Sequence, residues 1–294
     1  MFAEKTVVIT GASSGLGRQL AYDLASRRAR CVLFARNEAA LAEVVAECEK
    51  AGGEAIAVVG DVTIPEDCER LINEASARFG GIDIYLSNAG LSMWAAFEEV
   101  KDLNIFRRLM EVNYLGAVNG LHFALPHLKK SRGHMVAIAS IQSKIGVPYH
   151  TGYVASKHAL EGFCRALRYE LEGTSVTVLT VHPHWIRGTN MRTSACSGDG
   201  QSVGDRKLAH NGESISAAEC SAAILKARTS LPGFNGAVSY IETVSGTPNN
   251  DQMFGDLVDV APGSDVVVHA SGFRNPFELC LTTSGRLYAF DNGP

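Results

Sequence analysis

The chain has 294 residues, 46% of them hydrophobic and 20% charged, and a formal net charge of −4. This composition is typical of a globular protein that is large enough to bury a substantial core. No lysine- or arginine-rich block stands out, so nothing in the sequence indicates a surface for nucleic acid or anionic lipid.

The N-terminal segment MFAEKTVVIT runs directly into a strand-like pattern, without the charged and then apolar regions of a signal peptide. No apolar run approaches the roughly 18–20 residues that a membrane helix needs. The seven cysteines include no Cys-x-x-Cys pair and mostly fall inside apolar patterns. We therefore expect buried, reduced thiols, a cytoplasmic location and no membrane partner.

Short apolar segments alternate with amphipathic ones through the first four-fifths of the chain. In the segment LAEVVAECEK, Leu41, Val44, Val45 and Cys48 mark one helical face, and Pro65 fits an early position of the next helix. This alternation predicts the α/β class, with a single Rossmann-type doubly wound parallel sheet and helices on both faces. The predicted strands are rich in Val and Ile, and they span 5–10, 30–35, 54–60, 82–87, 133–139 and 175–181.

The pattern changes after about residue 190. Residues 194–214 are rich in Ser, Gly and Asp and predict a loop or mobile lid. A last helix is expected over 216–228 and a last strand over 234–241. We expect the first domain to span 1–242, and 243–294 to form a linker and a short β-rich C-terminal extension.

The segment TGASSGLG, residues 10–17, follows the first predicted strand and opens the first helix. A tight glycine turn at a helix N-terminus binds a pyrophosphate through backbone N–H groups, so the segment indicates a dinucleotide site. The alternative is a glycine-rich turn without a ligand. The candidate cofactor-binding residues here are Gly11, Ser13, Ser14, Gly15, Leu16 and Gly17.

The ends of the next strands indicate the cofactor type. Ala35 and Arg36 stand where an acidic residue would bind a ribose 2′-hydroxyl, and an arginine instead pairs with a 2′-phosphate. The residues thus favour NADP(H) over NAD, unless Arg36 is an ordinary surface side chain. Later strand ends add candidate cofactor contacts at Asp61, Val62, Asn88, Ala89 and Gly90.

Ser140 lies at the end of the fifth predicted strand, and Tyr153 and Lys157 follow it on one face of a helix. A phenol with a pKa near 10 is a poor base at neutral pH, and a neighbouring ammonium lowers that pKa. The pair therefore indicates acid–base chemistry, with Ser140 holding a substrate oxygen. Taken alone, a Tyr-x-x-x-Lys pair is also common on helix surfaces.

With these motifs in order, the sequence resembles the short-chain dehydrogenases/reductases over roughly residues 4–242. The resemblance implies that Tyr153 is the general acid/base and that Lys157 lowers its pKa and binds the nicotinamide ribose. It also implies that Ser140 orients the substrate and that Asn113, in MEVNYLG, holds a water of a proton relay. A helix-kinking role is the alternative for Asn113. Arg36 resembles the NADP-preferring subset of the family, with NAD remaining possible.

The segment HPHWIRGTNM departs from the family's pattern. Pro183 matches, His184 replaces a glycine, and Ile186 supplies a backbone position for the carboxamide. Thr189 lies one place late, so its contact is not carried over. His182 and His184 have no supporting cluster of metal ligands, which predicts a loop pair and no metal site.

The tail, residues 266–294, resembles part of a propeller blade of quinoprotein-type sugar dehydrogenases, through Gly272–Pro276, Gly285–Tyr288 and Asp291–Gly293. One blade cannot bury its faces alone. The tail is therefore either a truncated fusion or an extension particular to this chain, and no function follows from it.

The leading hypothesis is an oxidoreductase that transfers a hydride between NADP(H) and a carbonyl or secondary alcohol. The expected partners are a small-molecule substrate and further copies of the chain, as a homodimer or homotetramer. One alternative is a catalytically silent nucleotide-binding or scaffold protein of the same fold. Another is a propeller-type sugar oxidoreductase, against which the shortness of the tail argues.

Overall fold

The computed structural model describes residues 2–204, 214–230, 237–239, 279–281 and 287–289. By its internal contacts the chain divides into two compact units, Met1–Val238 and Ser239–Pro294. The predicted boundary at 242/243 falls among residues outside this description and stays a prediction.

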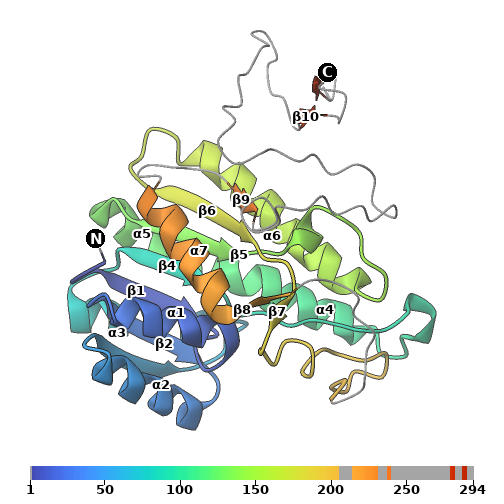
Figure 1. The fold of residues 1–294 in the computed structure, drawn as a ribbon, viewed down its shortest axis with the longest axis horizontal. Coiled ribbons are helices and arrows are strands. Elements are labelled where there is room, and N and C mark those ends of the chain that lie inside the picture. The colour runs from blue at the N-terminus through green and yellow to red at the C-terminus, as the bar shows by residue number, and fades with distance from the viewer. Residues whose placement is uncertain (1, 205–213, 231–236, 240–278, 282–286, 290–294) are drawn as a thin grey trace. The chain divides into compact units, whose positions relative to one another are not determined.

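A seven-stranded sheet in the order β3-β2-β1-β4-β5-β6-β9 forms the centre of the first unit (Figure 1). The pairs from β3 to β6 are all parallel, so the predicted parallel sheet is confirmed. The strands are β1 (Thr6–Thr10), β2 (Arg30–Ala35), β3 (Glu54–Val59), β4 (Ile84–Ser87), β5 (His134–Ile138), β6 (Thr177–His182) and β9 (Ala237–Ser239).

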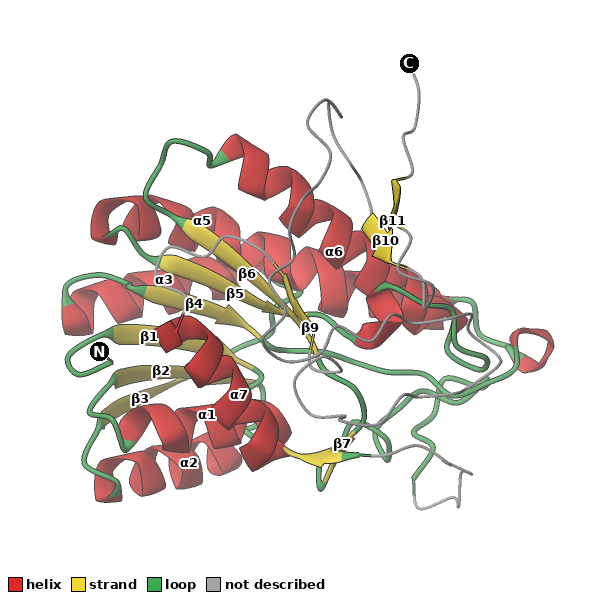
Figure 2. Cartoon of the chain, turned by 45° about the horizontal axis from the view of Figure 1, so that its top comes forward, coloured by secondary structure: helices red, strands yellow, loops and turns green. Residues whose placement is uncertain are grey.

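Helices cover both faces of this sheet (Figure 2). One face carries α1 (Gly15–Ala25), α2 (Glu38–Lys50) and α7 (Ala217–Ser230). The other carries α3 (Pro65–Phe79), α5 (Gly116–Ser131) and α6 (Thr151–Glu170), with α4 (Asn104–Met110) against α6. Helix α3 begins at the predicted proline. The doubly wound class is therefore confirmed.

Apolar burial between the layers stabilises this arrangement. Val8, Val32 and Tyr85 of adjacent strands pack with Leu121 and Leu160 of the covering helices, and all five are at most 2% exposed. Because strand order reverses between β1 and β4, the carboxyl ends of both strands border one crevice. Open α/β sheets bind their ligands at such a place.

The helical stretch from α4 to α5 contains a π-helical turn, η2 (Glu111–Leu115). Such turns shift the register of a helix and are frequent at functional sites. The turn contains Asn113, for which the sequence left a helix-kinking role as the alternative. The helix is indeed irregular at this residue.

The segment expected as a loop or lid, 194–214, is described up to residue 204. Cys196 N–H donates to the Ser92 carbonyl (2.8 Å), and Trp94 N–H donates to the Cys196 carbonyl (2.8 Å). This part is thus bonded to the chain after β4. Further on, β8 (Ile215–Ser216) pairs with β7 (Ile186–Arg187).

In the second unit, β10 (Leu279–Leu281) and β11 (Leu287–Ala289) pair antiparallel. Both strands fall within the C-terminal extension that the sequence predicts to be β-rich. The rest of 266–294, with most residues of the propeller resemblance, lies outside the described residues.

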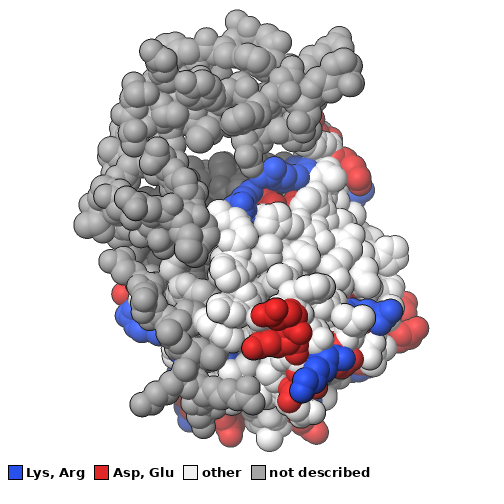
Figure 3. Space-filling model, turned by 90° about the vertical axis from the view of Figure 1, so that its right-hand side faces the viewer, with Lys and Arg blue, Asp and Glu red and all other residues white. Residues whose placement is uncertain are grey.

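The visible described surface in Figure 3 carries both signs of charge, interspersed among uncharged residues. Within the described part of the chain, every helix is too short or too polar to cross a bilayer. Six cysteines are described, and all six are free and buried, as expected: Cys31, Cys48, Cys68, Cys164, Cys196 and Cys220.

Candidate active site

The glycine-rich turn between β1 and α1 is tightly closed. Gly11 has a φ of 65° and Gly15 of 55°, in the left-handed region that glycine adopts without strain. A Cβ on Gly17 would lie 2.4 Å from the Gly11 carbonyl oxygen, so a larger residue would displace the turn. The backbone is therefore free of side chains where a phosphate group needs to approach it.

Thr10 and Asn88 join this turn to the end of β4. Thr10 Oγ1 accepts hydrogen bonds from the backbone N–H groups of Asn88 (3.0 Å) and Ala89 (3.1 Å). Asn88 Nδ2 donates to the carbonyl oxygens of Thr10 (3.0 Å) and Gly11 (3.3 Å). Asn88 thus shapes the turn, a structural task that the sequence analysis did not assign to it.

The N-terminus of α1 faces the same crevice. Its N-cap residue, Ser14, makes no side-chain capping hydrogen bond. The first N–H groups of a helix have no partner within the helix and attract anions. Because Ser13, Ser14 and Gly15 line the cavity, these donors are placed to hold a phosphate group.

Arg36 extends from the end of β2 at the outer end of the crevice. Its side chain is 79% exposed, and its Nη1 lies 3.6 Å from Asp61 Oδ2. Asp61 Oδ1 also accepts hydrogen bonds from the backbone N–H and hydroxyl of Thr63 (both 2.9 Å). The arginine is thus loosely paired and accessible to an anionic group.

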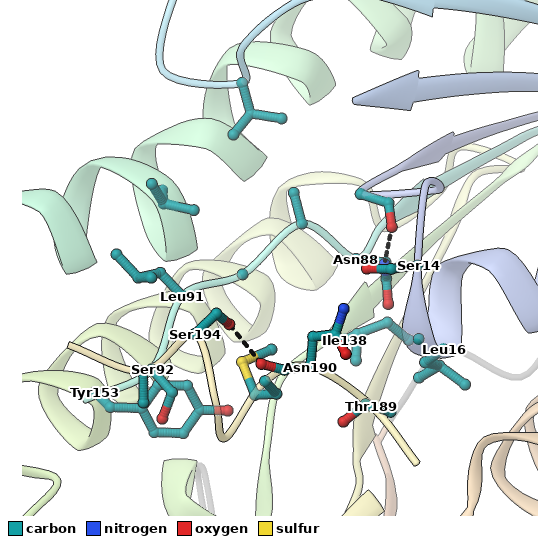
Figure 4. A pocket seen from close by; sticks show the side chains of 18 of the residues that line it. Ser14, Leu16, Asn88, Leu91, Ser92, Ile138, Tyr153, Thr189, Asn190 and Ser194 are labelled. Atoms are coloured by element: carbon teal, nitrogen blue, oxygen red, sulfur yellow. Dashed lines mark hydrogen bonds between the residues drawn. The ribbon is translucent and has the colours of Figure 1, made fainter. Parts of the chain in front are cut away.

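One cavity of about 1170 Å³ joins these groups to the predicted chemical residues. In Figure 4, the phenol of Tyr153 points into it at one end, and Ser14, Leu16 and Asn88 lie toward the other. All the predicted site residues except Gly17 and Asn113 line this cavity. The structure therefore brings together predicted site residues that are up to 175 positions apart in sequence (Gly11 to Ile186).

Lys157 is buried in the cavity wall with 3% exposure. Its Nζ donates to the carbonyl oxygen of Ile138, at the end of β5, over 2.9 Å. Burial lowers the pKa of Lys157 to about 8, because a desolvated ammonium is disfavoured. The ammonium also lies 5.7 Å from the centre of the Tyr153 ring.

Tyr153 is 8% exposed, and burial raises its pKa to about 12. A hydrogen bond with the Ser140 hydroxyl opposes this rise and is the smaller effect. In the chain on its own burial therefore determines the net direction of the Tyr153 pKa shift, and the expectation that Lys157 lowers this pKa stays a prediction. Desolvation of the phenolate is the larger contribution, and the lysine is bonded to Ile138 instead.

Asn113 lies behind the cavity wall and is 1% exposed. Its Oδ1 accepts from the Leu91 N–H (2.7 Å), and its Nδ2 donates to the Leu91 carbonyl (2.8 Å) and to Ser156 Oγ (2.8 Å). The side chain therefore fastens the π turn to the chain after β4 and to α6. Its expected part in a proton relay stays a prediction.

Aromatic side chains form the wall beside Tyr153. The His150 ring meets Trp94 edge-on at 4.9 Å, Trp185 at 5.6 Å and Tyr153 at 6.3 Å between ring centres. Tyr149 stacks on Trp94 at 5.8 Å. Met93, Trp94 and Trp185 line the cavity, whereas Tyr149 does not line it and contacts Trp94.

The segment after β6 closes the remaining side. Pro183 and Ile186 line the cavity, and the Pro183 carbonyl accepts from the Ile141 N–H (3.0 Å). Thr189, to which no contact was assigned, also lines it: a Cβ on Gly15 would lie 3.3 Å from the Thr189 side chain. His182 is directed away, with its Nε2 2.9 Å from Glu161.

Sequence reasoning missed three contributors to the site. The carbonyl of Ile138 and the backbone of Leu91 act through groups that every residue has, so residue type gives no signal. His150 carried a signal, since it lies three residues before Tyr153 at the start of the same helix.

A family model described as short chain dehydrogenase matches residues 5–199. The chain is 41% identical over 187 residues to an 11-beta-hydroxysteroid dehydrogenase-like protein 4A of Arabidopsis thaliana, covering 63% of this chain and 62% of that protein. It is 37% identical over 199 residues to an 11-beta-hydroxysteroid dehydrogenase of Pinus massoniana, covering 67% and 55%. The chain thus spans less than two thirds of the length of these relatives.

A solved structure is also similar. An alcohol dehydrogenase from the archaeon Thermococcus sibiricus, complexed with 5-hydroxy-NADP, superposes with a TM-score of 0.68 and 27% identity. The similarity covers 80% of this chain and 95% of that one.

Lys157→Met tests the cost of the buried ammonium. The pKa of Lys157 is about 8 in the folded chain and 10.5 in the unfolded chain. Between pH 10.5 and 8 Lys157 is protonated in the unfolded chain but not in the folded one. The free energy of unfolding therefore falls as pH falls through this range, and below pH 8 Lys157 causes no further change.

We expect the free energy of unfolding of the unsubstituted protein, minus that of Lys157→Met, to rise by about 3 kcal/mol between pH 8 and 10.5. Loss of the donor to Ile138 adds an offset that does not vary with pH. Urea unfolding at several pH values measures both. A pH-independent difference between the two proteins would show that the ammonium is not desolvated.

Proposed function

We propose, from the premise that this chain belongs to the short-chain dehydrogenase family, that it is an oxidoreductase interconverting a carbonyl and a secondary alcohol with NADP(H). The observation that carries the proposal is that Ser140, from the turn after β5, and Tyr153 and Lys157, from α6, line one end of a cavity whose other end is the glycine turn.

The residues present fit NADP(H). The tight turn and the uncapped N-terminus of α1 suit the pyrophosphate, and Arg36 suits the 2′-phosphate because it is exposed and Ala35 brings no competing carboxylate. Asp61, Val62, Ala89 and Gly90 would border the adenosine and ribose, and Pro183 and Ile186 the carboxamide. When bound, the cofactor supplies or accepts the hydride.

The side chains then have distinct tasks. The Ser140 hydroxyl holds the substrate oxygen beside the Tyr153 phenol. With a pKa raised to about 12, this phenol carries its proton at neutral pH, as a proton donor for carbonyl reduction must. Lys157 adds positive charge near the oxygen on which negative charge develops.

The aromatic wall supports a substrate with a bulky apolar body. Trp94, His150 and Trp185 offer flat apolar surfaces next to Tyr153, and such surfaces favour rings or long hydrocarbon groups. The plant relatives are named as hydroxysteroid dehydrogenases, which agrees with this substrate class.

We include in the proposal a homo-oligomer assembled through α5 and α6.

Tyr153→Phe tests the proposal against a panel of cyclic, aromatic and aliphatic ketones, followed by NADPH absorbance. Losing the proton donor should lower kcat at least about a hundredfold and leave the Kd for NADPH, measured by fluorescence, within about twofold. Tyr169→Phe is the matched control, because it lies on the same helix with its side chain exposed.

Full turnover by Tyr153→Phe would contradict the assigned role. If the unsubstituted protein binds NADPH and reduces none of the ketones, the catalytically silent binding protein is the better interpretation.

Arg36→Ala tests the cofactor preference. The unsubstituted protein should bind NADPH more tightly than NADH, and the variant should lose about tenfold to a hundredfold in NADPH affinity, because a charge-assisted contact to the 2′-phosphate is removed. The Kd for NADH should not change. Lys129→Ala removes one distant positive charge and should alter neither constant. Equal affinity of the unsubstituted protein for both cofactors would refute the preference.

A further inference from the structure

A carboxylate that the proposed reaction does not use lies buried beside the site. Glu161 is on α6, one helical turn after Lys157, and is 4% exposed. Its Oε1 accepts from Lys144 Nζ (2.8 Å) and Arg165 Nε (2.9 Å), and its Oε2 lies 2.9 Å from His182 Nε2. Burial raises the pKa of the carboxyl, but hydrogen bonds from His182 and Lys144 outweigh it and lower that pKa well below its usual range.

These contacts tie together three segments of the candidate site. Lys144 belongs to the chain that follows Ser140, Glu161 to the helix of Tyr153 and Lys157, and His182 to the end of β6 just before Pro183. The segments that carry Ser140, the Tyr153–Lys157 pair and Pro183 are thus all joined to the carboxylate of Glu161.

The link from Lys144 to Ser140 is short and stiff. Ser140 is the N-cap of the one-turn helix η3 (Ile141–Ser143), and Lys144 is its C-cap. Ser140 Oγ accepts from the Gln142 N–H (3.1 Å), the Ser143 hydroxyl donates to the Ser140 carbonyl (2.7 Å), and Lys144 N–H donates to the Ile141 carbonyl (2.9 Å). A tether at Lys144 therefore restrains Ser140 at the other end of this turn.

Arg165 provides an internal comparison. It binds the same oxygen, Glu161 Oε1, with the same charge and nearly the same distance. However, it lies on α6 itself, four residues after Glu161, so it joins no second segment. Its side chain is 38% exposed and that of Lys144 is 28% exposed.

We propose that the Lys144–Glu161 ion pair is a positioning contact that holds the Ser140 turn against α6, so that the Ser140 hydroxyl faces the Tyr153 phenol. The expected effect on kcat rests on the proposed function. The expected restraint of the Ser140 turn does not. An exposed ion pair contributes little. Here one partner is buried, and a small displacement of a substrate-holding group costs a large factor in rate.

The experiment compares Lys144→Met with Arg165→Met, which remove equal charge from the same oxygen. Hydrogen–deuterium exchange of the protein alone should become faster in peptides covering 139–150 for Lys144→Met only. With NADPH and a ketone substrate, Lys144→Met should lower kcat about tenfold to a hundredfold and leave the Kd for NADPH within about twofold. Arg165→Met should alter none of these.

Lys144→Arg should restore both the exchange rate and kcat, because it keeps the charge and the reach. Melting temperatures show whether each variant is folded, and Lys144→Gln, which also removes the charge, takes the place of Lys144→Met if that variant is not.

Equal effects of the two Met variants would overturn the proposal, since the charge at Glu161 would then matter and not the tether. Faster exchange without a fall in kcat would also overturn it. If the unsubstituted protein has no turnover, the proposed function fails, while the exchange comparison still decides whether Lys144 restrains the Ser140 turn.

Discussion

The hydrogen bond from the buried ammonium of Lys157 to the carbonyl of Ile138 is the contact on which the rest of the site depends. It fixes the start of α6 against the end of β5, and so places Tyr153 beside Ser140 at the carboxyl edge of the sheet. A buried ammonium is costly, and the lowered pKa of about 8 expresses that cost.

The same burial determines what Tyr153 does. In this environment the phenol keeps its proton up to high pH, which suits proton donation to a carbonyl oxygen. Accepting a proton, as alcohol oxidation requires, needs additional positive charge in the cavity. The oxidised cofactor carries such a charge, so in this account the acid–base properties of Tyr153 belong to the protein and cofactor together.

Much of the fold followed from local sequence. The predicted strands rich in Val and Ile begin and end close to the observed ones. The glycines of residues 11–17 marked the turn, because only glycine fits where a Cβ would meet backbone. The order of the strands placed the motifs at one edge of the sheet, which is why separate strand ends line a single cavity.

What could not be predicted depends on depth and on backbone groups. Whether the pKa of Tyr153 is raised or lowered depends on how deeply the ring is buried. The spacing of residues in the sequence does not reveal that depth. The π turn at Glu111–Leu115 looks like ordinary helix in the sequence, and Glu161 looks like a surface residue of an amphipathic helix until β6 and the Ser140 turn close around it.

Titration of the Tyr153 phenol tests most directly whether burial determines the acid–base behaviour of this group. The phenolate absorbance of the unsubstituted protein minus that of Tyr153→Phe, recorded against pH with and without NADP⁺, isolates this one group. We expect no ionisation of Tyr153 below about pH 10.5 in the protein alone and ionisation at lower pH when NADP⁺ is bound. Ionisation below pH 10 in the protein alone, or a titration that NADP⁺ does not change, would contradict this expectation.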